Sequence, residues 1–210
     1  MAGGLPAARM LPPQQQSGGL PSGELLPPPG PPTWRFVKRY TISIASIDTT
    51  PLGDILVPTQ AVHLMVEWEA IDNTANTGAA FGGLQLGTNN GAINTGNNYA
   101  WTDYSNANGG APTGTGANPA ASWAAFVTTG GGTGAAWRSK GTIKMLGVQD
   151  TSQTPKATWE TVQINNGTVV RRSGAGYVNF GGAVTKLHFF AGAGLLAPGT
   201  YFELWAAYAA

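Results

Sequence analysis

Clusters of glycine, asparagine, threonine and proline cut this chain into short segments, and this division constrains its fold more than any other feature. Of the 210 residues, 31 are glycine. From Trp34 onward the segments between the clusters are rich in β-branched and aromatic residues, which is typical of short strands joined by turns. No window of about ten residues predicts a helix. The sequence therefore indicates an all-β fold.

Alternation within the segments gives each predicted strand two different faces. Around residues 61–69 the pattern places Val62, Leu64, Val66 and Trp68 on one face and His63, Met65, Glu67 and Glu69 on the other, because successive side chains of a strand point to opposite sides. Asn166-Gly167 predicts a tight hairpin turn. We predict further strands over residues 34–45, 83–87, 99–104, 122–128, 137–148, 158–164, 168–172, 184–191 and 200–209, and loops over 87–98, 106–121 and 128–136.

Short strands with turns, and without alternating helices, favour an antiparallel β-sandwich of the jelly-roll kind. No sequence repeat of fixed period is found, so a solenoid or a propeller is disfavoured. We expect one β-sandwich domain over residues 34–210.

Residues 1–33 differ from the rest of the chain because they hold nine of its 15 prolines. Proline disfavours both helix and interior strand, so we expect an extended arm of polyproline-like backbone. A functionless leader is the alternative. Scattered apolar residues favour docking on a partner, since a solvated linker has little use for them. We expect these residues to anchor the arm: Leu5, Met10, Leu11, Leu20, Leu25 and Leu26.

The small number of charges limits which partners the chain can attract. Only 10% of the residues are charged and the net charge is +1, so we expect neither nucleic-acid binding nor membrane insertion. The chain has no cysteine, which removes disulfides and thiolate chemistry. The N-terminal residues contain no basic segment followed by an apolar run, so we do not expect a signal peptide. We therefore expect a protein that is made in the cytoplasm and goes elsewhere only by assembly or lysis.

Few side chains are available for acid–base catalysis, since the chain has ten acidic residues and two histidines. His63, Glu67 and Glu69 share a strand face and could together bind a metal, although a solvated strand face is the stronger interpretation. His188 lies in an apolar segment, where a structural role is expected. The glycine-rich segments 130–134 and 176–182 lack the features of a phosphate-binding loop and are interpreted as turns. We expect no enzyme activity, no cofactor and no metal.

Aromatic residues beside asparagine-rich segments suit contact with carbohydrate, because sugar rings stack on aromatic faces. Trp101 and Tyr104 are the clearest candidates, and packing in the core or in an interface is the alternative. The residues we consider for contact with a host glycan or receptor are Asn98, Tyr99, Trp101 and Tyr104.

The layout as a whole resembles virion surface proteins of tailed phages, in which an N-terminal arm precedes a displayed β domain. Three segments carry the resemblance. They are the alternating strand 61–66, the polar loop that closes on aromatic residues at 97–101, and the closing hairpin formed by 184–190 and 197–205.

The resemblance implies a virion component, and specifically a homotrimer. Its β-sandwich would form a tail-fibre or receptor-binding knob on the particle surface, and its residues 1–33 would dock on a capsid, tail or adaptor protein. A capsid decoration or head-spike protein is the near alternative. An enzyme that degrades glycans is a less favoured alternative. Such an enzyme needs two carboxylates about 5–10 Å apart in a groove, whereas the clearest acidic pair, Glu67 and Glu69, lies on one strand face. A secreted lectin is disfavoured by the expected lack of a signal peptide.

Overall fold

The computed structural model of the chain is an antiparallel β-sandwich, which confirms the predicted fold class. It describes residues 33–46, 48–52, 55–72, 80–88, 92–128, 137–152, 154–165, 168–179, 182–191 and 195–209. Apart from the short 3-10 turn η1 (Thr50–Leu52), the elements are strands: β1 (Trp34–Thr41), β2 (Ile55–Leu56), β3 (Ala61–Asp72), β4 (Ala80–Gly87), β5 (Tyr99–Ala107), β6 (Thr113–Ala120), β7 (Trp123–Thr128), β8 (Trp137–Leu146), β9 (Lys156–Asn165), β10 (Thr168–Val178), β11 (Lys186–Phe190) and β12 (Tyr201–Tyr208).

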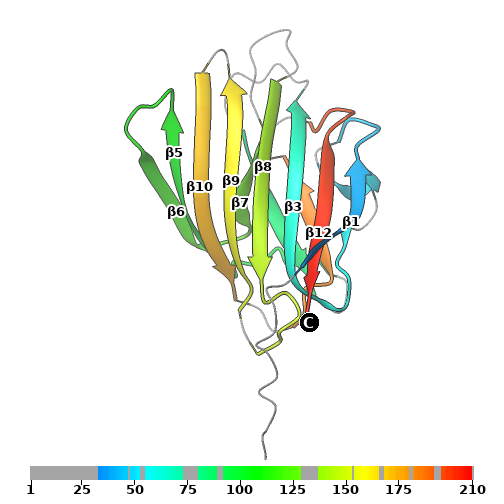
Figure 1. Cartoon of the computed structure of the whole chain (residues 1–210). Coiled ribbons are helices and arrows are strands. Elements are labelled where there is room, and N and C mark those ends of the chain that lie inside the picture. Colours follow the sequence, from blue (N-terminus) through cyan, green and yellow to red (C-terminus); the bar gives the residue numbers. More distant parts are fainter. Residues whose placement is uncertain are drawn as a thin grey trace, which may run out of the picture. The chain divides into compact units, whose positions relative to one another are not determined.

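The strands form a large and a small sheet that pack face to face (Figure 1). The large sheet has the order β1-β12-β3-β8-β9-β10-β5-β6, and the small one has the order β2-β11-β4-β7. The chain crosses repeatedly between the sheets, and β1 and β2 pair with β12 and β11 from the other end of the sequence. This is the wrapping of a jelly roll. Strands β9, β10, β5 and β6 extend the large sheet beyond it.

The core lies between the two sheets and is built from one face of each predicted strand. Leu64, Val66 and Trp68 are buried, as their alternation predicts. The rings of Phe189 in β11 and Phe202 in β12 stack with their centroids 4.5 Å apart, so they join the two sheets directly. Such a pair contributes about 0.5–1.5 kcal/mol beyond its buried area.

The extended half of the large sheet has its own aromatic core. The indole of Trp123 in β7 donates a hydrogen bond to the carbonyl of Tyr177 in β10 at 3.0 Å. The ring of Trp123 also meets that of Tyr99 edge to face, with centroids 5.7 Å apart. The small sheet therefore supports part of the extension through β7.

Most predicted strands are found, with shifted ends. Strands β9 and β10 pair so that Asn165 lies opposite Thr168, which is the register of a hairpin with two connecting residues. Residues 166 and 167 themselves lie outside the described part of the chain. The first strand ends at Thr41 rather than at residue 45, and Ile44 is exposed beyond it.

Two predicted loops are wrong in part. Residues 113–120 form β6, which pairs with β5 at the edge of the large sheet. Glycine, threonine and alanine hid this strand from a pattern based on β-branched and aromatic residues. The segment 176–182 was interpreted as a turn, but β10 continues to Val178.

Tryptophans explain why glycine occurs inside the strands. An added Cβ would lie 2.4 Å from the ring of Trp159 at Gly174 and 2.3 Å from the ring of Trp68 at Gly141. Each glycine thus leaves room for an indole on the inner side of the large sheet, where both tryptophans are buried. These glycines allow close packing rather than a turn.

Candidate interaction face

The outer face of the large sheet, turned away from the small sheet, is the most extensive candidate site. In β8 its residues alternate with the buried Ser139, Ile143 and Met145. The central strands of the outer face carry Met65, Glu67 and Glu69 from β3, Lys140, Thr142, Lys144 and Leu146 from β8, and Lys156, Thr158, Glu160 and Val162 from β9.

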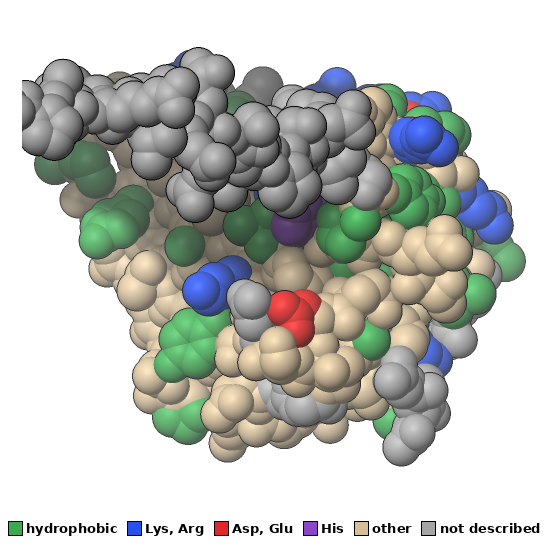
Figure 2. Space-filling model, turned by 60° about the horizontal axis from the view of Figure 1, so that its bottom comes forward, with side chains coloured by type: hydrophobic (Ala, Val, Ile, Leu, Met, Phe, Trp, Pro, Cys, Tyr) green, Lys and Arg blue, Asp and Glu red, His purple; other side chains and the backbone are tan. Residues whose placement is uncertain are grey.

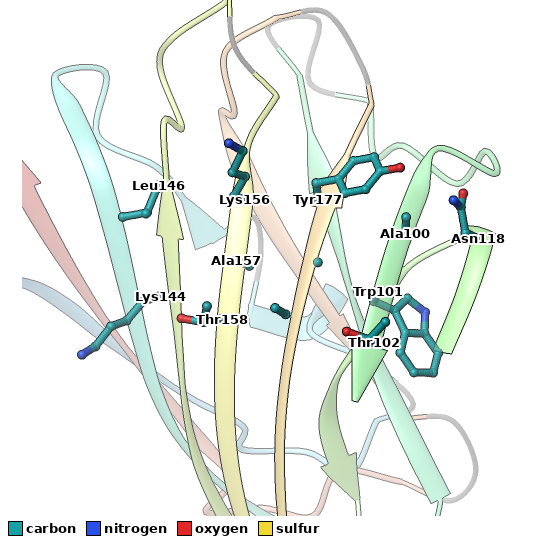
Figure 3. A pocket seen from close by; sticks show the side chains of 12 residues that line it. Ala100, Trp101, Thr102, Asn118, Lys144, Leu146, Lys156, Ala157, Thr158 and Tyr177 are labelled. Atoms are coloured by element: carbon teal, nitrogen blue, oxygen red, sulfur yellow. The ribbon is translucent and has the colours of Figure 1, made fainter. Parts of the chain in front are cut away.

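A hollow of about 520 Å³ lies on the outer face over β8, β9, β10, β5 and β6. Figure 3 shows the side chains around it, which come from all five strands. Leu146, Ala100 and Tyr177 are apolar or aromatic, and Lys144 and Lys156 are basic. The volume falls within the range of small-molecule sites, and none of the residues that line the hollow is acidic.

A neighbouring hollow of about 480 Å³ lies at the end of the sheet where β8 connects to β9, and it shares Leu146 and Lys156 with the first. His63 and Asp150 also line it. Figure 2 looks toward this end and shows hydrophobic, basic and acidic side chains around a depression. The face therefore continues from the large hollow to the edge of the sandwich.

Glu69 is the most deeply placed carboxylate of the outer face. Lys140 Nζ lies 3.0 Å from its Oε2, and the Arg138 guanidinium donates a hydrogen bond to Oε1. Burial raises the pKa of Glu69, but the hydrogen bonds and charges of Arg138 and Lys140 outweigh it and bring the pKa below its ordinary value. Glu69 is thus an ion-paired structural residue.

His63, Glu67 and Glu69 share one face of β3, as their spacing predicts. The carboxylate of Glu69 is already held by its two cations. Among the described residues no group of three histidine or acidic side chains is placed to hold a metal ion.

Glu67, Glu160 and Glu203 line another hollow of the outer face, together with Lys140 and Tyr201. Glu203 lies directly opposite Glu67 in the register and is paired with Arg39, whose Nε lies 2.8 Å from its Oε1. Glu160 is exposed. A glycan hydrolase would need a carboxylate pair within a groove. The carboxylates of Glu67, Glu160 and Glu203 line a hollow on an open sheet face.

The four residues considered for glycan contact are not brought together. Tyr99 is 1% exposed, and its hydroxyl accepts a hydrogen bond from Leu86 N at 2.8 Å and donates one to Asn94 O at 3.1 Å. Burial raises its pKa to about 12. Tyr99 is a core residue, so its side chain is not available to a ligand at the surface.

The other three residues lie at separate positions in the structure. Asn98 is exposed and its side chain donates a hydrogen bond to Asn94 Oδ1. Trp101 lines the hollow of about 520 Å³ and also packs against the core. Tyr104 is exposed on the outer face, in a hollow that it shares with Glu160 and Arg171. Only Trp101 thus lies at the large hollow.

The residues that best define the face were missed at the sequence level. Lys144, Leu146 and Tyr177 come from strands that the sequence does predict at least in part, and the alternation Lys140, Thr142, Lys144, Leu146 marks one face of β8. The signal was present within each strand. The pairing of β8 with β9 and β10, which makes one face of them, was not visible because it depends on contacts between separate segments.

A buried ion pair is a second feature that the sequence did not reveal. Arg172 Nη2 lies 2.9 Å from Asp103 Oδ2, and Arg172 Nε donates to Oδ1 at 3.1 Å. Both side chains are buried on the inner side of the large sheet. Arg171 points the other way and is exposed. Arg171 and Arg172 are consecutive in β10 and therefore lie on opposite sides of the sheet, as expected for a strand.

The segment predicted as an anchoring arm, residues 1–33, lies outside the described residues apart from Thr33. This applies to Leu5, Met10, Leu11, Leu20, Leu25 and Leu26. In the part of the chain that the structure describes, no helix is long and apolar enough to cross a membrane.

Comparison with known proteins finds no matching family model, no matching curated protein and no matching solved structure.

Proposed function

We propose that this chain is a structural, non-enzymatic protein of a tailed-phage virion. In this proposal the β-sandwich is a tail-fibre or receptor-binding knob exposed on the particle, and residues 1–33 dock on a capsid, tail or adaptor protein. The knob assembles as a homotrimer. The resemblance in the sequence and the proline-rich arm support this proposal, and a capsid decoration or head-spike protein is the alternative location.

The observation that carries the proposal is the outer face. Six of the eight large hydrophobic side chains that are exposed among the described residues occupy outward positions of the large sheet. Exposed apolar surface rimmed by polar residues is typical of interaction sites. The same face holds one hollow lined by lysines and by no acidic residue, and another lined by glutamates together with a lysine. A face of this kind suits contact with other subunits.

The test is to locate the chain on intact particles. Particles from a producing culture are purified, and the chain is detected by antibody labelling and imaging, first with the full chain and then with residues 1–33 deleted. We expect the full chain at the tail and loss of the deleted chain from the particles. Labelling over the head would favour the decoration alternative. Absence of the full chain from particles, or equal incorporation of the deleted chain, would contradict the proposed anchoring.

A further inference from the structure

The exposed hydrophobic residues are concentrated on one side of the molecule. Eight large hydrophobic side chains are exposed among the described residues, and only Ile44 and Leu56 lie outside the large sheet. The other six occupy outward positions: Phe36, Tyr104, Leu146, Val162, Val169 and Tyr177. They do not form one continuous patch: Leu146 and Tyr177 lie in one row near one end of the sheet, and Val162 and Val169 lie near the other end. The charged groups between them therefore carry the argument for a partner.

The charges of the outer face indicate what the partner is. Glu67, Thr142 and Glu160 lie side by side in one row across β3, β8 and β9. The two glutamates are therefore about 10 Å apart, with a threonine between them. Lys144 lies in the next row, two residues along β8, which is about 7 Å away. Glu67, Glu160 and Lys144 form no ion pair with another described residue.

This arrangement is complementary to itself. Consider a second copy that is related to the first by a twofold axis. The axis runs perpendicular to the strands and lies between the row of Thr142 and the row of Lys144. The row that contains Lys144 in each copy then lies over the row that contains Glu67 and Glu160 in the other. Lys144 of one copy then lies above Thr142 of the other, between Glu67 and Glu160. In each copy, the space between Glu67 and Glu160 would hold the ammonium group of Lys144 from the other copy. The apolar side chains around this space would be covered by the other copy at the same time.

We propose that the outer face of the large sheet binds a second copy of this chain, with Lys144 inserted between Glu67 and Glu160 of its neighbour. The contact is isologous, since the same face of both copies takes part, so it forms a twofold pair. It is therefore a different contact from the one within the proposed trimer. This inference deepens the proposed structural role. It rests on that role because a protein of a virion must associate with other subunits. Its test uses only the purified full chain, so it can fail while the chain is still found on particles.

The test combines charge reversal with rescue. The mass of the full chain in solution is measured by light scattering over a range of concentrations. We expect an oligomer whose dissociation constant rises about tenfold or more in Lys144→Glu, because a like charge then faces the two glutamates. Lys38→Glu is the matched control, since Lys38 lies opposite the inward-facing Leu204 and so does not share the outer face.

Rescue separates a direct contact from a general loss of stability. Glu67→Lys/Glu160→Lys should also weaken association, and mixing it with Lys144→Glu should restore mixed oligomers, because the opposite charges meet again. Circular dichroism checks that each variant is folded. A wild-type chain that stays monomeric, an oligomer unaffected by Lys144→Glu, or a failure of the mixture to associate would each overturn the proposal. A monomer that instead binds an acidic glycan at Lys144 and Lys156 would also overturn it.

Discussion

The carboxylate of Glu69 is held by two cations on the neighbouring strand, although an acidic residue on a strand face is more often solvated. Arg138 and Lys140 both come from β8, in positions set by the pairing of β3 with β8. A lowered folded-state pKa means that the ionised form stabilises the fold. This contribution is complete above the ordinary value of 4.5 and is lost as the pH falls through the lowered pKa.

We therefore expect Glu69→Gln to be less stable than the wild type at neutral pH and to lose less stability between about pH 5 and pH 2. Urea denaturation at a series of pH values measures both effects. In Arg138→Gln the pKa of Glu69 should move back toward its ordinary value, so the acid-induced loss should be smaller and should end at a higher pH. The same pH dependence in Glu69→Gln as in the wild type would show that other groups are responsible.

Asp103 and Arg172 form a pair of a different kind, because both are buried. Removing one partner leaves an uncompensated charge in the interior, so we expect Arg172→Met to cost about 3–5 kcal/mol in the free energy of unfolding. The double variant Asp103→Leu/Arg172→Met should cost less than the sum of its parts. Arg39→Met, which breaks an exposed pair, should cost no more than about 1 kcal/mol. The prediction is wrong if denaturation gives Arg172→Met the small cost of Arg39→Met.

At the scale of elements, the glycine-rich strands are the main difference between expectation and structure. β10 continues through Gly174 and Gly176, and β6 contains Gly114 and Gly116. The glycines of β10 lie beneath indole rings from β9 and β7, which a side chain would displace. A glycine that marks a turn and a glycine that admits a tryptophan look the same in a sequence, because the difference lies in a partner from another segment.

We expect Gly174→Ala to destabilise the fold by about 1–3 kcal/mol, because the added methyl group overlaps the buried ring of Trp159. Gly114→Ala is the matched control. Its added Cβ would lie 3.2 Å from the ring of Tyr104, which is exposed and can move aside, so the change should be within about 0.5 kcal/mol. Equal denaturation midpoints for the two variants would argue against the packing role of Gly174.

At the scale of the whole molecule, four strands are added to one sheet of a jelly roll. They make the large sheet broad, and its outer face, which points away from the small sheet, is broad as well. The jelly roll is complete with the other four strands of the large sheet and the four of the small one. The extension carries Tyr177, Glu160 and most of the large hollow, whereas Lys144 and Glu67 belong to the jelly roll, so the proposed contact between copies uses both parts. The arm over residues 1–33 and this face are the two proposed routes by which the chain joins a larger assembly.

The sequence by itself determined the fold class, most strands and the two faces of each strand, because alternation and turn residues act over a few neighbouring positions. It correctly separated Leu64, Val66 and Trp68 from Glu67 and Glu69. Only the tertiary structure decided which strands are neighbours. The pairing of these strands buries Tyr99 and brings Asp103 to Arg172. It also packs tryptophan rings against glycines and places Lys144 near two glutamates. These features depend on contacts between residues far apart in the chain, which no local pattern records.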